Sequence, residues 1–292
     1  MKIKLPDGVR MGNVNDDYTG VTAIVFDNGC VCGCDVRGGA PGTKETALLG
    51  SEKANEHVDA VALCGGSAYG LISSCGVMRA LKEEGKGVKV MDKIVPIVPA
   101  AVIYDLNHKE YHYPSEEMGY NAVKTATNEV QSGKVGAGKG ATVGKILGPQ
   151  NCSQSGLGIG RVEIGGAEVI AVVVVNAFGD VRKDGKIVAG AKLGSEFIDT
   201  LAVLSTADLS GNGANTTIGC IITDAKLSKV QANKLASIAH NGLAKTIFPV
   251  HTDLDGDTMF CASVGSKDVD FIRLQVACVA AVEAAIIDAV KL

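Results

Sequence analysis

The chain has 292 residues, of which 46% are hydrophobic, so it is long enough to bury a sizeable core. Its formal net charge of −4 leaves no excess of lysine and arginine to neutralise a phosphate backbone, which argues against a nucleic-acid partner. The longest apolar run, Val169 to Ala177, is too short to cross a bilayer and no apolar stretch follows the basic N-terminus, so we expect a cytoplasmic protein with no signal peptide and no membrane partner.

Apolar runs alternate with helical patterns along the chain. Runs bounded by glycine or aspartate predict strands at 21–26, 30–36, 58–63, 169–175, 218–222 and 258–263. Helical patterns cover 68–84, 120–131, 228–246 and 269–290, with Ser67 and either Asp224 or Ser228 as N-caps. The last helix is apolar nearly all round, so we expect other protein to cover it on several sides. The irregular alternation predicts a single α/β domain with packed sheet layers.

Three of the nine cysteines alternate in Cys30-Val31-Cys32-Gly33-Cys34, which places them on one face of a strand. This spacing lacks the Cys-x-x-Cys pairs of structural zinc sites. We therefore predict reduced thiols that act as small core side chains, and a soft-metal site is the alternative.

Two segments approach a known motif without matching it. The glycine-rich run 136–145 is not a Walker A loop, because Gly144-Lys145 is followed by Ile146 and the position five before Gly144 is not glycine. We predict instead a tight turn that delivers a lysine into a site. His108 and His112 lie four residues apart but lack the glutamate of His-Glu-x-x-His, so we expect surface residues.

The acidic segment HTDLDGD at 251–257 carries three carboxylates at alternate positions. It is not a calcium loop of the EF-hand type, because Thr258 and Val264 stand where that loop needs glycine and glutamate. Two interpretations stay open: a solvated acidic turn, or a pair of close carboxylates whose coupled titration serves a catalytic centre.

The tripeptide Asn215-Thr216-Thr217 has the form of a glycosylation acceptor, but that modification requires secretion. An ordinary turn and a site of self-cleavage both remain. A lone threonine is a poor nucleophile, and no Gly-x-Ser-x-Gly elbow accompanies this one. If Thr216 attacked the carbonyl of Asn215 and became an N-terminus, its own α-amino group would accept the proton of its hydroxyl.

Longer motifs spread over most of the chain match one known family. They are GNV at 12–14, TGVT at 19–22, DVRGGAPGTKET at 35–46, LCGGSAYGL at 63–71, VPIVPAA at 95–101, the turn at 136–145, NAFGD at 176–180 and NTTIG at 215–219. In these segments the chain resembles the L-aminopeptidase/D-esterases, a family of self-cleaving N-terminal-nucleophile enzymes that includes β-peptidyl aminopeptidases and nylon-oligomer hydrolases.

The resemblance implies a cut between Asn215 and Thr216, which gives an α chain of residues 1–215 and a β chain of residues 216–292 with Thr216 as the nucleophile. It further implies roles for residues elsewhere in the chain. Asp255 and Asp257 would orient the amine and hydroxyl of Thr216, Asn176 would help to bind the oxyanion, and Lys145 would contribute to the same field. Tyr104 is a further match, at a position where many relatives carry phenylalanine.

The implied fold is a four-layer α/β/β/α sandwich that assembles into homo-tetramers or larger homo-oligomers and needs no metal or cofactor. The implied activity is hydrolysis of amide bonds in small peptides, amino-acid amides or amide oligomers through an acyl-enzyme. Two other functions stay open: acyl transfer as in ornithine acetyltransferases, which share this architecture and use an N-terminal threonine, and a non-catalytic homo-oligomer or metal-binding protein built around Cys30, Cys32 and Cys34.

Overall fold

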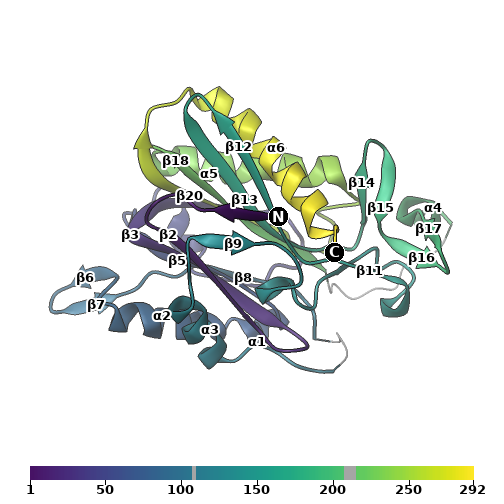
Figure 1. Cartoon of the computed structure of the whole chain (residues 1–292), viewed down its shortest axis with the longest axis horizontal. Helices are drawn as coiled ribbons and strands as arrows, with labels where there is room; N and C mark the ends of the chain where they lie inside the picture. Colours follow the sequence, from purple (N-terminus) through teal and green to yellow (C-terminus); the bar gives the residue numbers. More distant parts are fainter. Residues whose placement is uncertain (107–109, 207–214) are drawn as a thin grey trace.

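A computed structural model describes residues 1–106, 110–206 and 215–292 of the chain (Figure 1). Nine of the described strands share one hydrogen-bonded network. Their order is β12 (Leu157–Ile164), β13 (Ala167–Asn176), β18 (Thr216–Ala225), β20 (Thr258–Lys267), β3 (Gly20–Val36), β5 (Val58–Cys64), β8 (Ala100–Val102) and β4 (Thr43–Lys44), with β2 (Val9–Asn15) also paired to β3.

Strand β3 belongs to both sheet layers of the protein. Its first half pairs with β2 and β5, and its second half pairs with β20. The pairing with β5 shifts register between Val25 and Cys30, where Gly29 has a left-handed φ of 68°. A bulge of this kind bends a strand and increases its twist, so the two halves of β3 carry the chain from one layer into the other.

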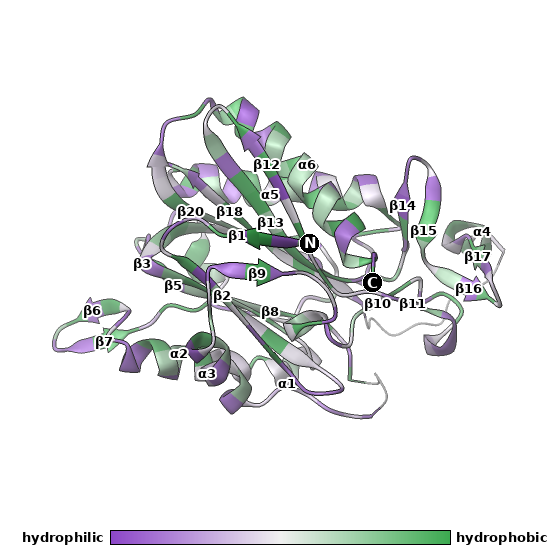
Figure 2. Cartoon of the chain, in the orientation of Figure 1, coloured by the Kyte–Doolittle hydropathy of each residue, from purple (hydrophilic) through white to green (hydrophobic). Residues whose placement is uncertain are grey.

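Three apolar cores separate four layers. One lies between the β12, β13, β18, β20 layer and the helices α5 (Lys229–Thr246) and α6 (Phe271–Ala289). The second lies between the two sheets, and the third lies between the β3, β5, β8 layer and the helices α2 (Ser73–Glu83) and α3 (Glu116–Lys124). The expected α/β/β/α sandwich is therefore confirmed, and Figure 2 shows hydrophobic residues along β13 and α6.

Strand β13 shows how the sequence builds two cores at once. Val169, Ala171, Val173 and Val175 enter the helix-side core, and the residues between them enter the core between the sheets. Side chains alternate between the two faces of a strand, so a continuous apolar run is what a strand covered on both faces requires. Full burial of each valine or isoleucine contributes about 1.5–3 kcal/mol.

Helix α6 packs directly on β12 because of two glycines. A Cβ atom at Gly158 or Gly160 would overlap the carbonyl oxygen of Ala285 or Ala281 on the helix. The opposite face of α6 stays open in the single chain, with Ile272 69% and Val276 63% exposed. The expectation that this helix is covered on several sides holds for its inner face only.

The remaining described elements are short. They are α1 (Ser67–Gly70), α4 (Thr200–Leu204), η1 (Ala47–Leu49), η2 (Gly136–Gly138), η3 (Pro149–Asn151), and the strands β1 (Lys2–Lys4), β6 (Val88–Val90), β7 (Lys93–Val95), β9 (Glu129–Gln131), β10 (Thr142–Val143), β11 (Ser153–Gln154), β14 (Asp180–Lys183), β15 (Lys186–Ala189), β16 (Ala191–Leu193), β17 (Glu196–Ile198) and β19 (Ile247–Phe248). None of the helices in the described ranges has the length and apolar character that crossing a membrane demands.

Two of the helices expected from the sequence are wrong in their bounds. The helix expected at 120–131 starts earlier, after the N-cap Ser115, and ends at Lys124, while Glu129–Gln131 pairs with β1 as strand β9. The helix expected at 68–84 divides into α1 and α2, and its expected N-cap Ser67 lies inside α1 with a φ of 51°. Ser228 is confirmed as an N-cap, where it forms a capping box with Gln231.

Candidate active site

The topology brings the Asn215-Thr216 peptide to the centre of one sheet. Thr216 is the first residue of β18, which lies between β13 and β20, and its side chain is buried with 4% of its surface exposed. Strand β13 runs antiparallel, so its last residue, Asn176, lies opposite Thr216. Strand β20 runs parallel, so the residues just before it lie beside Asn215, which forms a bridge with Asp255.

The carbonyl group between Asn215 and Thr216 is held from two sides. The Gly256 N–H donates a hydrogen bond to the Asn215 carbonyl oxygen at 3.0 Å. The hydroxyl of Thr216, the residue that follows Asn215, donates to the same oxygen. The Asn215 side chain is anchored as well, because its Nδ2 donates to the Leu254 carbonyl at 3.1 Å. The Thr216 hydroxyl and the Asn215 carbonyl group are thus in contact, and a backbone donor is already on the carbonyl oxygen.

Asp255 and Asp257 are buried and receive several donors. Asp255 accepts hydrogen bonds from the Phe178 N–H at 3.2 Å and from the Thr252 hydroxyl at 2.7 Å. Asp257 accepts the Thr217 N–H at 2.6 Å. The interpretation of the whole segment as a solvated acidic turn is therefore wrong for these two residues, and it holds only for the exposed Asp253.

Burial and a neighbouring negative charge shift the pKa of Asp255. Burial, followed by the charge of Asp257, raises the pKa of Asp255 to about 6. The hydrogen bond from Thr252 and the charge of Lys145 oppose that rise. A buried carboxyl group whose pKa is raised toward neutrality is a common arrangement in acid-base catalysis.

Asn176 is fixed by contacts with two further predicted residues. Its Oδ1 accepts from the Lys145 ammonium at 2.8 Å and from the Thr142 N–H at 3.1 Å. Its Nδ2 donates to the Tyr104 carbonyl oxygen at 2.8 Å, so this contact with Tyr104 is made through the backbone. An amide nitrogen carries two hydrogens, and the amide orientation is set by the two donors on Oδ1.

Lys145 is a buried cation at the end of the glycine-rich turn. Besides Asn176 Oδ1 it contacts the Asn176 carbonyl oxygen at 3.0 Å. Burial lowers its pKa to about 8, while Cys152, Asp255 and Asp105 oppose that shift. The prediction of a turn that delivers a lysine to a site agrees with this geometry. Near pH 7 the ammonium form still dominates and supplies positive charge beside Asn176.

Three contributors to this site were not singled out from the sequence. The Gly256 N–H holds the Asn215 carbonyl, and His251 donates from its ring Nδ1 to Asp257 at 2.8 Å. Asp105 accepts the Thr19 hydroxyl at 2.8 Å, and burial raises its pKa to about 6. Asp105 directly follows Tyr104, which was the only signal in the sequence for it.

The other candidate sites lie outside this cluster. All nine cysteines are free, and Cys30 and Cys32 are buried in the core between the sheets, which confirms their prediction as core side chains. Across the described ranges, no group of three or more His, Cys, Asp or Glu side chains is arranged to hold a metal ion. His112 is a surface residue paired with Asp16 at 2.6 Å, and His108 lies outside the described residues.

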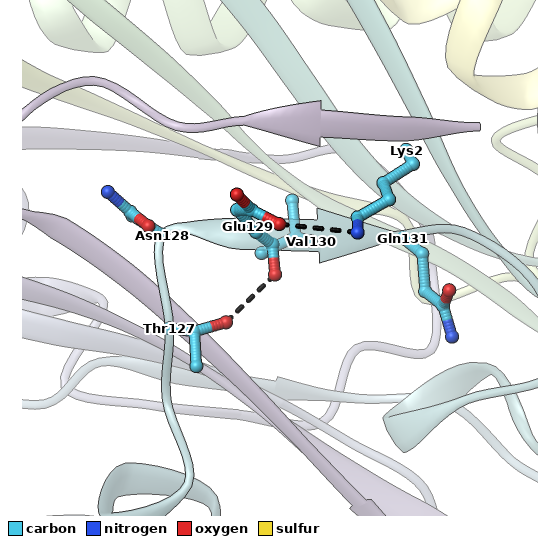
Figure 3. A pocket seen from close by; sticks show the side chains of 6 residues that line it. All are labelled: Lys2, Thr127, Asn128, Glu129, Val130 and Gln131. Atoms are coloured by element: carbon cyan, nitrogen blue, oxygen red, sulfur yellow. Dashed lines mark hydrogen bonds and ion pairs between the residues drawn. The ribbon is translucent and has the colours of Figure 1, made fainter.

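A separate surface groove of about 460 Å³ runs along strand β9 (Figure 3). It is lined by Lys2, Thr127, Asn128, Glu129, Val130 and Gln131. Lys2 and Glu129 form an ion pair at 3.2 Å there, and none of the lining residues belongs to the Thr216 cluster. The groove is therefore separate from the Thr216 cluster.

The chain is similar to several known proteins along most of its length. Residues 7–291 match the model of peptidase family S58. An uncharacterized aminopeptidase of Mycobacterium leprae is 41% identical over 269 residues, which cover 85% of this chain and 72% of that protein. A 6-aminohexanoate-oligomer endohydrolase of Kocuria sp. is 31% identical over 280 residues, which cover 90% of this chain and 74% of that protein.

Among solved structures, the L-aminopeptidase D-Ala-esterase/amidase of Ochrobactrum anthropi superposes with a TM-score of 0.72 at 18% identity, covering 98% of this chain and 86% of that one. That structure is described as a variant of the Ntn hydrolase fold. At this level of identity the likeness establishes the fold, which agrees with the layers and cores described above.

Proposed function

The chain belongs to peptidase family S58, and on that premise we propose that it is a self-processing amidohydrolase with Thr216 as its nucleophile. One observation carries the proposal. The Thr216 hydroxyl contacts the carbonyl group of Asn215, whose oxygen already accepts the Gly256 N–H at 3.0 Å. A nucleophile, an electrophile and a donor for the developing oxyanion thus meet at one peptide bond.

Self-cleavage begins when Thr216 Oγ1 attacks the carbonyl carbon of Asn215. The tetrahedral intermediate places its negative charge on the oxygen that the Gly256 N–H holds. Collapse breaks the C–N bond, and the nitrogen takes up a proton, so the Asn215 acyl group becomes an ester of Thr216. Water hydrolyses that ester, which leaves a carboxylate on Asn215 and a free amine and hydroxyl on Thr216.

The new amine then acts as the base for catalysis. It accepts the proton of the Thr216 hydroxyl while Oγ1 attacks the substrate amide, and it passes that proton to the departing amine. The acyl-enzyme that remains is hydrolysed by water in a second step. An α-amino group titrates near pH 8. At neutral pH it is therefore a better base for the Thr216 hydroxyl than the groups of an uncut turn would be.

The surrounding residues support this cycle through charge and position. Asn176, opposite Thr216, has its amide fixed by Lys145 and Thr142, so its N–H is a preorganised donor for the oxyanion. The Lys145 ammonium adds positive charge behind that amide. Asp255 and Asp257 lie near the other side of Thr216, and their negative charge would stabilise the new ammonium group there.

We propose amide bonds as the substrate class, in small peptides, amino-acid amides or amide oligomers. Two relatives are named for cleavage of such bonds, one as an aminopeptidase and one as an oligomer endohydrolase. A panel of ordinary dipeptides, β-dipeptides, D-amino-acid amides and 6-aminohexanoate oligomers ranks these substrates by kcat/KM. Activity on none of them, by a protein that has cut itself, would reject the substrate class.

We also propose that the protein assembles as a homo-tetramer or larger homo-oligomer. Ile272 and Val276 lie one helical turn apart on the open face of α6 and are both well exposed. Light scattering on the purified protein gives the mass in solution. A monomer at micromolar concentration would contradict this proposal without affecting the catalytic one.

Denaturing electrophoresis with intact mass measurement tests the cut directly. The wild-type protein should separate into chains of residues 1–215 and 216–292. Thr216→Val keeps the shape of the side chain and removes the nucleophile, so it should remain one chain. Thr216→Ser keeps a hydroxyl and should still be cut.

Thr217→Val is the matched control for these variants. Its hydroxyl is buried without a hydrogen-bond partner in the described structure, so it should be cut like the wild type. A wild-type protein that stays a single chain under all conditions rejects self-processing. A cut in Thr216→Val at the same bond rejects Thr216 as the agent.

A further inference from the structure

We infer that His251 is a positioning residue that holds the carboxyl group of Asp257 in place beside Thr216, with His240 packed behind it. The inference rests on the proposed function, because it assigns unequal roles to the two aspartates beside Thr216. His251 stands between β19 and β20, and His240 stands on α5. The two rings meet edge to face with centroids 4.8 Å apart.

The backbone of His251 is shaped to serve Asp257. Its φ of 58° lies in the left-handed region, which few residues other than glycine adopt. In this conformation its backbone N–H and its ring Nδ1 both reach Asp257 Oδ2, at 3.2 and 2.8 Å. The other oxygen of Asp257 takes the Thr217 N–H at 2.6 Å, so both carboxylate oxygens receive donors.

The hydrogen bond to a carboxylate fixes the tautomer of His251. Nδ1 must carry a hydrogen in order to donate, so in the neutral ring Nε2 is an acceptor. That Nε2 atom is buried and has no hydrogen-bond partner within the described residues. The ring therefore makes its polar contact on the Asp257 side, and its other edge is committed to packing.

His240 closes the far side of His251. Its Nε2 lies 3.1 Å from the Asp35 carbonyl oxygen, and its side chain is fully buried. Burial, with a contribution from the nearby His251 ring, lowers the pKa of His240 to about 4, so this ring is neutral in the physiological range. A neutral neighbour leaves His251 to interact with Asp257 without a competing charge beside it.

Two further charged groups, Asp35 and Arg37, lie on the His240 side of the pair of rings. Asp35 lies 3.5 Å from His240 Nε2 and is paired with Arg37 at 3.1 Å. On the Thr216 side, Asp255 lies two residues before Asp257, and Lys145 opposes the rise in the pKa of Asp255. Donors from Thr217 and His251 thus converge on Asp257, whereas burial raises the pKa of Asp255.

A pair of variants that differ in one property tests the inference. Asn and Leu have nearly the same shape, but only Asn places an N–H donor near the position of Nδ1 and tolerates the left-handed conformation. His251→Asn should keep kcat within about threefold of the wild type. His251→Leu should lower kcat by about 10- to 100-fold with KM little changed, because a hydrogen bond to a charge is lost.

The pH profile separates positioning from mere packing. Loss of the Nδ1 donor removes a stabilising contact from the charged form of the Asp257 carboxyl group, so the acid limb of kcat/KM should move to higher pH in His251→Leu. The acid limb should stay in place in His251→Asn. Equal activity and equal pH profiles in the two variants would overturn the inference.

Two further measurements keep the test decisive. If His251→Leu does not fold, His251→Gly accepts the same φ, and added imidazole should restore activity. Restoration supports the inference, whereas a His251→Gly protein as active as His251→Asn without imidazole overturns it. Electrophoresis of the wild type shows whether the chain is cut at all, so failure of the proposed function is seen separately.

Discussion

Gly256 offers a sharp test of how the Asn215 carbonyl is activated. A Cβ atom at this position would lie 2.5 Å from the Ala40 carbonyl oxygen and 2.9 Å from Thr216 Oγ1. Carbon atoms do not approach oxygen so closely, and the first of these neighbours is backbone. In Gly256→Ala the loop must therefore shift, which moves the Gly256 N–H away from the Asn215 carbonyl oxygen that it holds at 3.0 Å.

The expected magnitude follows from the role of that donor. Loss of one preorganised oxyanion donor costs about 10²- to 10³-fold in rate, or about 2.7–4 kcal/mol of transition-state stabilisation. Self-cleavage of Gly256→Ala should slow by that factor. The assay follows the conversion of freshly purified precursor to two chains by electrophoresis over time.

A second glycine serves as the control for this variant. Gly50 has an ordinary φ of −52°, and the nearest atoms to a Cβ there belong to the flexible end of Glu52. Gly50→Ala should cut at the wild-type rate. A Gly256→Ala protein that is folded, as judged by its thermal melt, and is cut as fast as Gly50→Ala would refute this role for the Gly256 N–H.

Three further predictions concern the charged and apolar groups of the molecule. Lys145→Met should lower kcat/KM by about 10²-fold and remove an alkaline limb of the pH-rate profile near pH 8. The pKa of Lys145 is lowered to about 8, so the wild-type side chain loses its positive charge above that pH. An alkaline limb that is unchanged in Lys145→Met contradicts this prediction. Asp105→Asn should melt a few degrees above the wild type at pH 8 and no higher than the wild type at pH 4. The pKa of Asp105 is raised to about 6, so the wild-type protein loses folding stability as the pH rises through 6 and this carboxyl group becomes charged. Calorimetry at both pH values checks the sign. Cys32→Ser should lower the free energy of unfolding by about 1–3 kcal/mol, because it buries a hydroxyl in an apolar core, and it should leave self-cleavage intact. Loss of cleavage with unchanged stability in urea would instead indicate a functional thiol cluster.

The sequence alone predicts β5, β13, β18 and β20 well, because they are apolar and bounded by glycine or aspartate, but it misses β2 and β12 of the same network. It misreads β3 as two strands, since Asp27-Asn28-Gly29 has the composition of a hairpin turn. The chain instead passes through this point as one bent strand, because its two halves pair with different partners. Such a choice is made by tertiary packing and leaves no local signal.

The residues of the candidate site also fall into two groups: those that the sequence predicts and those that only tertiary packing brings into place. Thr216, Asp255, Asp257, Asn176 and Lys145 were found because they stand in recognisable motifs, and the fold brings all five together at the start of β18. His251 was visible in the sequence but carried no role, since its partner ring His240 comes from another element and Asp35 lies 205 residues before His240. Contacts across such separations depend on the whole topology, and a single sequence does not display them.

The place of β18 in the sheet sets an order of events for the proposed cut. The segment 216–292 contains β18, α5, β20 and α6, so it provides two inner strands of one sheet and the whole helical layer outside it. Neither this segment nor the rest of the chain has a complete core without the other. Thr216 can meet Asn176 only after both parts have packed, so we expect the uncut chain to serve as the folding template and the proposed cut to follow folding. Residues 1–215 and 216–292 expressed as two separate polypeptides would not have folded as one chain, even though together they contain every residue of the protein.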